Sequence, residues 1–326
     1  MKRNSAIEFY RCLLMFGICL LHCVHRDARL GEWLEQLLLP CVCGFVFISG
    51  WYGVRFAPSK VLKIYGVFLY CIVTMEIMKY VSEGCFSIAC LLGGIRNYWF
   101  AHAYVLMMLL APLVDHAIEK VHVRALLPFM FAVYGWGFLA RFPIINQFVP
   151  KTADLNMYSG LTLLGAYATA RILRGCRVDE RLPMKMLLVA FLALGVVCSM
   201  LHLGFYNSPF AVAFAGCGFL IFKRFNLSRG RVWLWLAQST FSVYFFHLGS
   251  ATIGTGFMLT IADKMDILPY RFIALFVGTL VSFLLCIVVD VPRRLLVVVL
   301  KTKIGMIGQY VDERYDGLCR RLITNQ

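Results

Sequence analysis

The sequence predicts an all-α fold: a polytopic integral membrane bundle of about ten transmembrane helices, with both termini in the cytoplasm. Hydrophobic residues make up 61% of the 326-residue chain and charged residues only 15%, and the mean hydropathy is +0.77. Soluble proteins are about half apolar and about a quarter charged. Apolar segments of about 20 residues, long enough to cross a bilayer, recur along the chain. Basic residues concentrate in alternate segments between them.

Ten apolar segments, separated by stretches that contain charged residues, Gly or Pro, are the expected spans. They cover residues 6–25, 34–52, 61–82, 97–116, 124–142, 157–173, 185–204, 208–222, 231–250 and 272–292. Spans of this length and their loops use up the chain, so we expect one transmembrane domain over residues 1–326. Its last part, about residues 293–326, is basic and mildly amphipathic. It fits either a helix along the inner leaflet or a solvated cytoplasmic tail.

The distribution of positive charge predicts the orientation of these spans. If the N-terminus is cytoplasmic, most of the 32 Lys and Arg residues lie in inner loops and in the C-terminal tail. This asymmetry is the positive-inside rule. Inner loops beside anionic lipids account for most of the net charge of +15, so we expect membrane lipids and no nucleic acid as partners.

The first span carries ionisable residues where a bilayer tolerates few. Arg11 and His22 are eleven positions apart, which at 100° per residue places them on one helical face, about 16 Å from each other. Ionisable groups inside a span usually face the bundle interior and mark a pathway or a reaction site. Glu8 is close enough to neutralise Arg11. The alternative for Glu8 and Arg11 is a buried ion pair that only fixes helix packing.

Further polar residues are expected at the depth of His22. The ninth span places Tyr244 and His247 in its outer half, and the fourth span places Trp99 and His102 in its outer third. Histidine suits general-base chemistry on a hydroxyl because its pKa lies near the working pH. We therefore expect a catalytic or substrate site where these residues meet, with a structural role at helix ends as the alternative.

A basic cluster follows the second span. Arg55, Lys60 and Lys63 lie within nine residues, and the two lysines are one helical turn apart. Side chains so spaced can clamp the phosphates of a cofactor. Ordinary positive-inside anchoring is the alternative.

The cysteines and histidines show no metal-binding pattern. Most of the 13 cysteines fall inside apolar segments, and we interpret them as small packing residues. No HxH or HxxxH pair supplies two ligands from one helix, so we expect no metal. Cys85 and Cys90 share one expected outer loop, where they either pair or stay free.

The chain resembles the membrane-bound acyltransferase family 3, whose bacterial members acylate sugars of cell-envelope polysaccharides. The first span, IEFYRCLLMFGICLLH, matches the family pattern of an arginine, ten residues and a histidine, which are Arg11 and His22 here. Supporting stretches are ISGWY, YWFAHAYVLMMLLAPL, LLGAYATAR, FSVYFFH and DVPRRL, in that order along the spans. Where the family usually has two arginines separated by two residues, this chain has Lys60 and Lys63, which keep the charge but lose the bidentate geometry.

The resemblance implies a function and roles for residues. Acetyl-CoA would bind from the cytoplasm as the acyl donor, with Lys60 and Lys63 at its phosphates, Arg11 orienting the donor and His22 acting as catalytic base near the outer side. The expected protein is a membrane O-acetyltransferase of the bacterial inner membrane, acting on a hydroxyl of a glycan or lipid-linked sugar. A succinyl donor and a homo-oligomer stay open. The alternatives are a transporter that uses the buried Arg and His as a substrate or proton relay, and a structural or sensory subunit.

Overall fold

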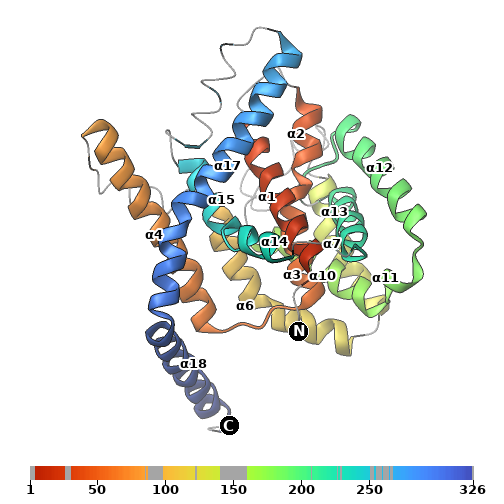
Figure 1. Ribbon diagram of the computed structural model, residues 1–326. Coiled ribbons are helices and arrows are strands. Elements are labelled where there is room, and N and C mark those ends of the chain that lie inside the picture. Colours follow the sequence, from red (N-terminus) through yellow and green to blue (C-terminus); the bar gives the residue numbers. More distant parts are fainter. Residues whose placement is uncertain are drawn as a thin grey trace.

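A computed structural model of the chain describes residues 4–25, 31–84, 86, 98–121, 123–139, 160–206, 208–225, 227, 230–249, 253–254, 259, 264 and 267–324. Every regular element in these residues is a helix, and they contain no strand. The prediction of an all-α fold is confirmed, and the helices form one bundle (Figure 1).

The helices follow the expected spans. The first are α1 (Ser5–His25), α2 (Glu32–Leu38), α3 (Pro40–Tyr52), α4 (Pro58–Glu83), α6 (Trp99–Lys120), α7 (Val123–Leu139) and α10 (Gly160–Gly175). They continue with α11 (Val178–Arg181), α12 (Met184–Met200), α13 (Pro209–Lys223), α14 (Gly230–Ala237), α15 (Thr240–Gly249), α17 (Leu268–Val299) and α18 (Lys301–Thr324). Each expected span overlaps one of these helices or two consecutive ones.

Two expected spans are each divided between two helices. The span at 34–52 is split between α2 and α3, because Pro40 begins α3 and its ring cannot continue the hydrogen bonding of α2. The span at 231–250 is split between α14 and α15, where the Thr240 hydroxyl donates to the Ala237 carbonyl oxygen (2.9 Å). All four short helices pack against α1, so the splits let the chain fold around it.

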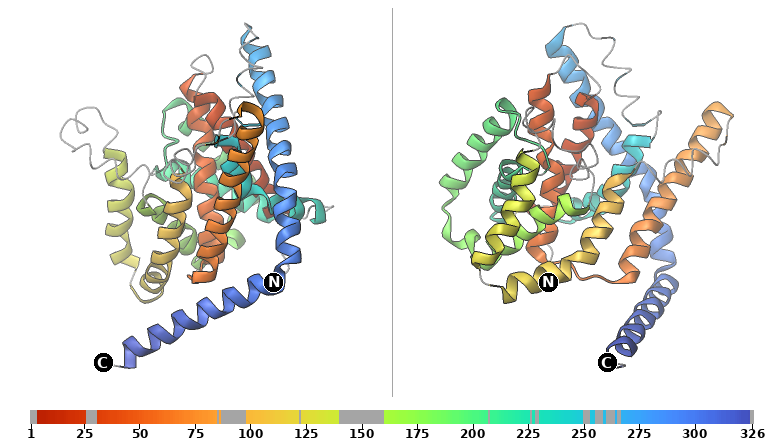
Figure 2. Two further views of the ribbon diagram at one scale, coloured as in Figure 1. Left: turned by 90° about the vertical axis from the view of Figure 1, so that its left-hand side faces the viewer. Right: turned by 180° about the vertical axis from the view of Figure 1, so that it is seen from behind.

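Membrane crossing is supported by the length and composition of the helices. Among the described residues, five helical segments are long and apolar enough to cross a bilayer. They are Ser5–His25, Glu32–Tyr52, Pro58–Glu83, Trp99–Lys120 and Leu268–Val299. The chain is therefore a multi-pass membrane protein, while ten crossings stay a prediction. α1 begins and α17 ends at one end of the bundle, here called the N-terminal end (Figures 1 and 2). The side of the membrane that it faces stays a prediction.

Helix α1 lies in the middle of the bundle. It packs against α2, α3, α13, α14, α15 and α17, and these helices lie around it in Figure 1. Most of its side chains are buried, including Glu8. Of the ionisable residues of the first span, Glu8 is buried, Arg11 and His22 are half-buried among the surrounding helices, and His25 is exposed at the end of α1.

The C-terminal helix α18 leaves the bundle at an angle to α17 and contacts the start of α4 (Figure 2). Its Asp312 carboxylate accepts hydrogen bonds from the Ser59 backbone N–H (2.9 Å) and hydroxyl (2.7 Å), which satisfies a free donor in the first turn of α4. These two bonds lower the pKa of Asp312 below its usual range. The Tyr315 ring meets Phe56 edge-on at 5.5 Å. The tail is thus a helix with a specific contact to the bundle.

The cysteines of the described residues are all free thiols. Most are buried, and several, such as Cys19 and Cys71, belong to the apolar core, which agrees with a packing role. Cys85 and Cys90, the expected pair, lie outside the described residues.

Candidate active site along helix α1

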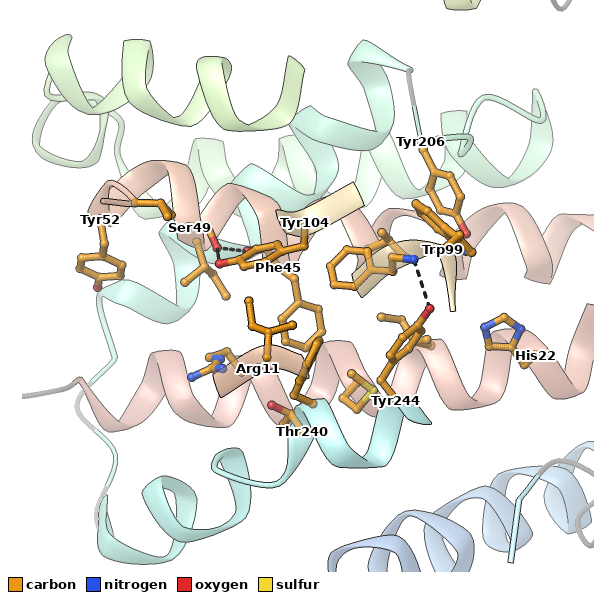
Figure 3. Close-up of a pocket in the computed structure, with 18 of the residues that line it drawn as sticks. Arg11, His22, Phe45, Ser49, Tyr52, Trp99, Tyr104, Tyr206, Thr240 and Tyr244 are labelled. Atoms are coloured by element: carbon orange, nitrogen blue, oxygen red, sulfur yellow. Dashed lines mark hydrogen bonds between the residues drawn. The ribbon is translucent and has the colours of Figure 1, made fainter. Parts of the chain in front are cut away.

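One face of α1 forms the wall of a cavity of about 390 Å³, which we call the upper chamber. Arg11, Met15, Ile18 and His22 line it, and their spacing of four, three and four residues keeps them on a single face. Arg11 and His22 stand at opposite ends of the chamber, joined by the apolar residues between them (Figure 3). The predicted polar stripe therefore lines a real cavity.

The Arg11 end of the upper chamber contains an ion pair and a hydroxyl pair. Arg11 Nη1 lies 3.0 Å from Glu8 Oε2, and the Glu8 side chain is only 8% exposed. On the facing helix α3, the Ser49 hydroxyl is 3.0 Å from the Tyr104 hydroxyl of α6. Tyr52 also lines this end (Figure 3). Arg11 is thus charge-paired inside the bundle, as the sequence predicted.

The His22 end brings two histidines together. The rings of His22 and His247 have centroids 5.1 Å apart and are tilted by 44°. His247 is fully buried, and its Nδ1 lies 2.8 Å from the Val243 carbonyl oxygen. Because a carbonyl only accepts, a neutral His247 ring carries its proton on Nδ1 and presents a lone pair on Nε2. The two imidazoles are therefore direct neighbours at this end of the chamber.

Aromatic side chains form most of the remaining wall. The Trp99 and Tyr206 rings lie 5.5 Å apart at the His22 end. The Tyr244 hydroxyl accepts a hydrogen bond from the Phe100 backbone N–H (3.4 Å), as Figure 3 shows. An apolar wall with a few polar groups is the usual composition of a small-molecule site.

His102, the third predicted histidine, faces a different helix. Its Nδ1 lies 3.0 Å from the Tyr65 hydroxyl of α4, and its ring is 6.1 Å from that of Phe68. The structure therefore joins His22, Tyr244 and Trp99 around one chamber, with His247 buried behind His22, and it directs His102 towards α4.

The basic cluster after α3 lies at the surface, beside neither Arg11 nor His22. Lys60 and Lys63 are exposed in the first turns of α4, and Lys60 Nζ donates to the Arg55 carbonyl oxygen (2.7 Å). Arg55 lines a shallow hollow together with the acidic residues Asp115 and Glu119. Of the residues of α4, only Ile64, one position after Lys63, lines the upper chamber.

A second cavity, of about 630 Å³, adjoins the first at the N-terminal end of the bundle, and we call it the lower chamber. Arg11, Ile48 and Tyr52 line both chambers. Its other polar residues come from the start of α1, the region of α10 and α11, and the end of α13: Asn4, Glu8, Arg174, Arg177, Asp179, Glu180 and Lys223. Sequence reasoning counted the basic residues here only as inner-loop charge, and their convergence was missed.

Hydrogen bonds and an ion pair hold the loop after α3, at Gly53 and Val54, in place. Gly53 takes a φ of 79°, which favours glycine, and turns the chain after α3. The next residue, Val54, donates its N–H to the Tyr167 hydroxyl (3.2 Å), which in turn donates to the Asp115 carboxylate (3.0 Å). Arg171 Nε pairs with the same carboxylate at 2.9 Å. Residues of α3, α6 and α10 thereby fix the loop that lines the upper chamber.

Comparison with known proteins gives one match. A family model described as an acyltransferase domain, Acyl_transf_3, matches residues 4–291, from the start of the described chain to within α17. No curated protein and no solved structure gives a significant match. The matched region includes both chambers and leaves α18 outside.

Proposed function

Because the chain belongs to acyltransferase family 3, we propose that it is a membrane O-acetyltransferase. In the proposed reaction an acetyl group moves from cytoplasmic acetyl-CoA to a hydroxyl of a cell-envelope glycan or lipid-linked sugar. The observation that carries the proposal is the upper chamber, which runs along one face of α1 from Arg11 to His22. A CoA thioester cannot cross a bilayer, whereas its acyl arm can extend along such a chamber. The bacterial inner membrane is the proposed location, since acetyl-CoA is available at its cytoplasmic face.

In the proposed reaction His22 is the general base. It takes the proton of the acceptor hydroxyl while the hydroxyl oxygen attacks the thioester carbonyl carbon, forming a C–O bond. The tetrahedral intermediate then collapses, the C–S bond breaks, and the leaving sulfur takes the proton back from the imidazolium. The products are the acetyl ester and free CoA. His247, 5.1 Å away between ring centroids, orients His22 and shares the proton.

Arg11 has a different role, because its Cα lies about 16 Å along the helix from that of His22. A side chain at that distance does not contact the carbonyl that His22 serves. We assign Arg11 to the donor, which must pass it to reach the reaction site. Glu8 balances its charge when no donor is bound, at a distance of 3.0 Å.

The test is transfer of radiolabelled acetyl from acetyl-CoA to surface glycans taken from cells that lack the protein, with succinyl-CoA as a second donor. We expect His22→Ala to lower transfer by about 10²–10⁴-fold, the usual contribution of a general base. The matched control is His25→Ala, which removes an exposed imidazole three residues further along α1 and retains transfer. Undiminished transfer by His22→Ala would contradict the mechanism.

A further inference from the structure

The lower chamber holds charged side chains that the acyl transfer step does not use. Four basic residues line it, Arg11, Arg174, Arg177 and Lys223, together with three acidic ones, Glu8, Asp179 and Glu180. Glu8 pairs with Arg11, and Asp179 pairs with Lys223. The other two arginines, Arg174 and Arg177, also line the chamber, where Glu180 is the one lining carboxylate outside these two pairs.

Contacts with α3 and with the end of α13 hold the segment that carries these two arginines in place. Arg224, which follows α13, donates from Nη2 to the Asp179 carbonyl oxygen (2.5 Å) and also to the Leu182 carbonyl oxygen. Lys223 lies over the Trp51 ring, 5.0 Å from its centroid, and Arg174 Nη1 donates to the Trp51 carbonyl oxygen (2.6 Å). The α10–α11 connection is thus attached to two other helices. A site built this way loses little entropy when a ligand binds.

The two chambers together are suited to one elongated ligand. The lower chamber is charged and about 630 Å³ in volume, the upper one is largely apolar and about 390 Å³, and they share Arg11, Ile48 and Tyr52. A molecule that fills both has an anionic head and a long, weakly polar arm. An acyl-CoA has this composition, with its phosphates at one end and its thioester at the other.

We propose that the lower chamber is the phosphate-binding subsite for the acyl-CoA donor, with Arg174 and Arg177 pairing with its phosphate groups. This inference rests on the donor named in the proposed function. Guanidinium groups bind phosphate oxygens through two parallel hydrogen bonds, which lysine cannot do. From this subsite the acyl arm passes Arg11 and reaches His22 through the upper chamber.

The alternative phosphate site is the pair Lys60 and Lys63. Like Arg174 and Arg177, both are exposed, and Asp312 of α18 lies beside them, close enough for their charges to contribute to its lowered pKa. Neither lysine lines the upper or the lower chamber. The hollow at Arg55 shares Val54 with the upper chamber, but neither lysine lines that hollow, so a phosphate held by the lysines would lie outside each of these cavities.

Direct binding to the purified full chain, in detergent without anionic lipid, tests the subsite. The probes are CoA, dephospho-CoA and pantetheine, and the variant is Arg177→Asn. Arg177 has a φ of 51°, which Asn tolerates better than most residues, so the variant removes the charge without straining the turn. The matched control is Arg181→Asn, which removes an exposed arginine four residues further on that does not line the chamber.

We expect Arg177→Asn to raise the Kd for CoA about tenfold, the loss of one charge-assisted contact, and to leave the Kd for pantetheine unchanged. Arg181→Asn should bind both as the wild type does. An unchanged CoA affinity in Arg177→Asn would overturn the subsite, as would a larger effect of Lys60→Gln combined with Lys63→Gln.

Two further outcomes separate the subsite from related claims. If added phosphatidylglycerol displaces CoA from the wild type but not from Arg177→Asn, the chamber binds lipid phosphate and the proposal is overturned. If the wild type binds none of the three probes, the acyl-CoA donor of the proposed function fails, and the subsite fails with it. Wild-type CoA binding with an unaffected Arg177→Asn would sink the subsite alone.

Discussion

The upper and lower chambers meet at Arg11, yet different side chains line them. Apolar and aromatic residues surround the upper chamber, and its ionisable groups are Arg11 at one end and His22 at the other. Seven ionisable residues line the lower chamber, several of them joined in ion pairs. In the proposed function, charge recognition and proton transfer are thus separated by the length of α1 between Arg11 and His22. The side chains that could hold a charged ligand group therefore lie at the end of this face of α1 opposite to His22.

Among variants that probe the two chambers separately, the largest expected effect comes from filling the upper chamber alone. Ile18 is buried and lines it midway between Arg11 and His22. Ile18→Trp should lower acetyl transfer by about 100-fold, because the thioester can no longer reach its reactive position, with CoA still bound in the lower chamber. The control is Leu13→Trp, at an exposed position on the same helix. A block of both transfer and CoA binding would show that the chambers do not act separately.

The boundary between the chambers gives the next largest effect. Arg11→Gln removes the guanidinium that pairs with the buried Glu8 carboxylate and should lower the free energy of unfolding by about 2–3 kcal/mol, read as a fall in melting temperature. The double variant Glu8→Gln with Arg11→Gln removes both charges, so most of that stability should return. Transfer should stay low in the double variant. Recovery of both transfer and stability would show that the ion pair only stabilises helix packing.

Variants that loosen the loop after α3, which lines the upper chamber at Gly53 and Val54, should have a smaller effect. Tyr167→Phe removes the acceptor of the Val54 N–H and the donor to Asp115. Loss of about 1 kcal/mol per hydrogen bond should raise the KM for acetyl-CoA several-fold with little change in kcat. Tyr134→Phe, which removes a hydrogen bond to Thr169 (2.7 Å) away from this loop, is the control. An equal effect of both variants would indicate general destabilisation.

The smallest effect concerns α18, which lies outside both chambers. The hydrogen bonds from Ser59 lower the pKa of Asp312, so the α18 contact is stabilised above the ordinary carboxyl pKa. That stabilisation is lost as the pH falls through the lowered value. Asp312→Ala should speed hydrogen exchange of the Ser59 amide at neutral pH, whereas the exposed control Asp316→Ala should not. CoA binding should be unchanged in both, and a weakened affinity would assign α18 to the donor site.

Sequence reasoning succeeded where one helix carries the whole pattern. Arg11 and His22 lie on a continuous helix, so their spacing alone determines that they share a face. It also predicted the depth of Trp99 and His102 but not which way each side chain points. Phe100 lines the chamber, and His102, two residues further on, is turned by about 200° and faces α4.

The lower chamber was missed because its residues come together only through tertiary packing. Arg174 lies in the last turn of α10 and Arg177 directly precedes α11, whereas Lys223 ends α13, and no helical periodicity links the arginines with the lysine. Each also satisfies the positive-inside pattern, which hides a second role. Tyr206 of the upper chamber lies between α12 and α13, where no helical period applies. The signal that was available is the density of arginines at residues 171–181 beside a family motif.

The most direct test of the two-chamber account is an experimental structure of the His22→Ala variant with acetyl-CoA bound, since this variant does not turn the donor over. The account predicts the phosphates at Arg174 and Arg177, the acyl arm passing Arg11 and Tyr52, and the thioester next to position 22. Phosphates at Lys60 and Lys63, or a nucleotide at the His22 end of the upper chamber, would contradict it.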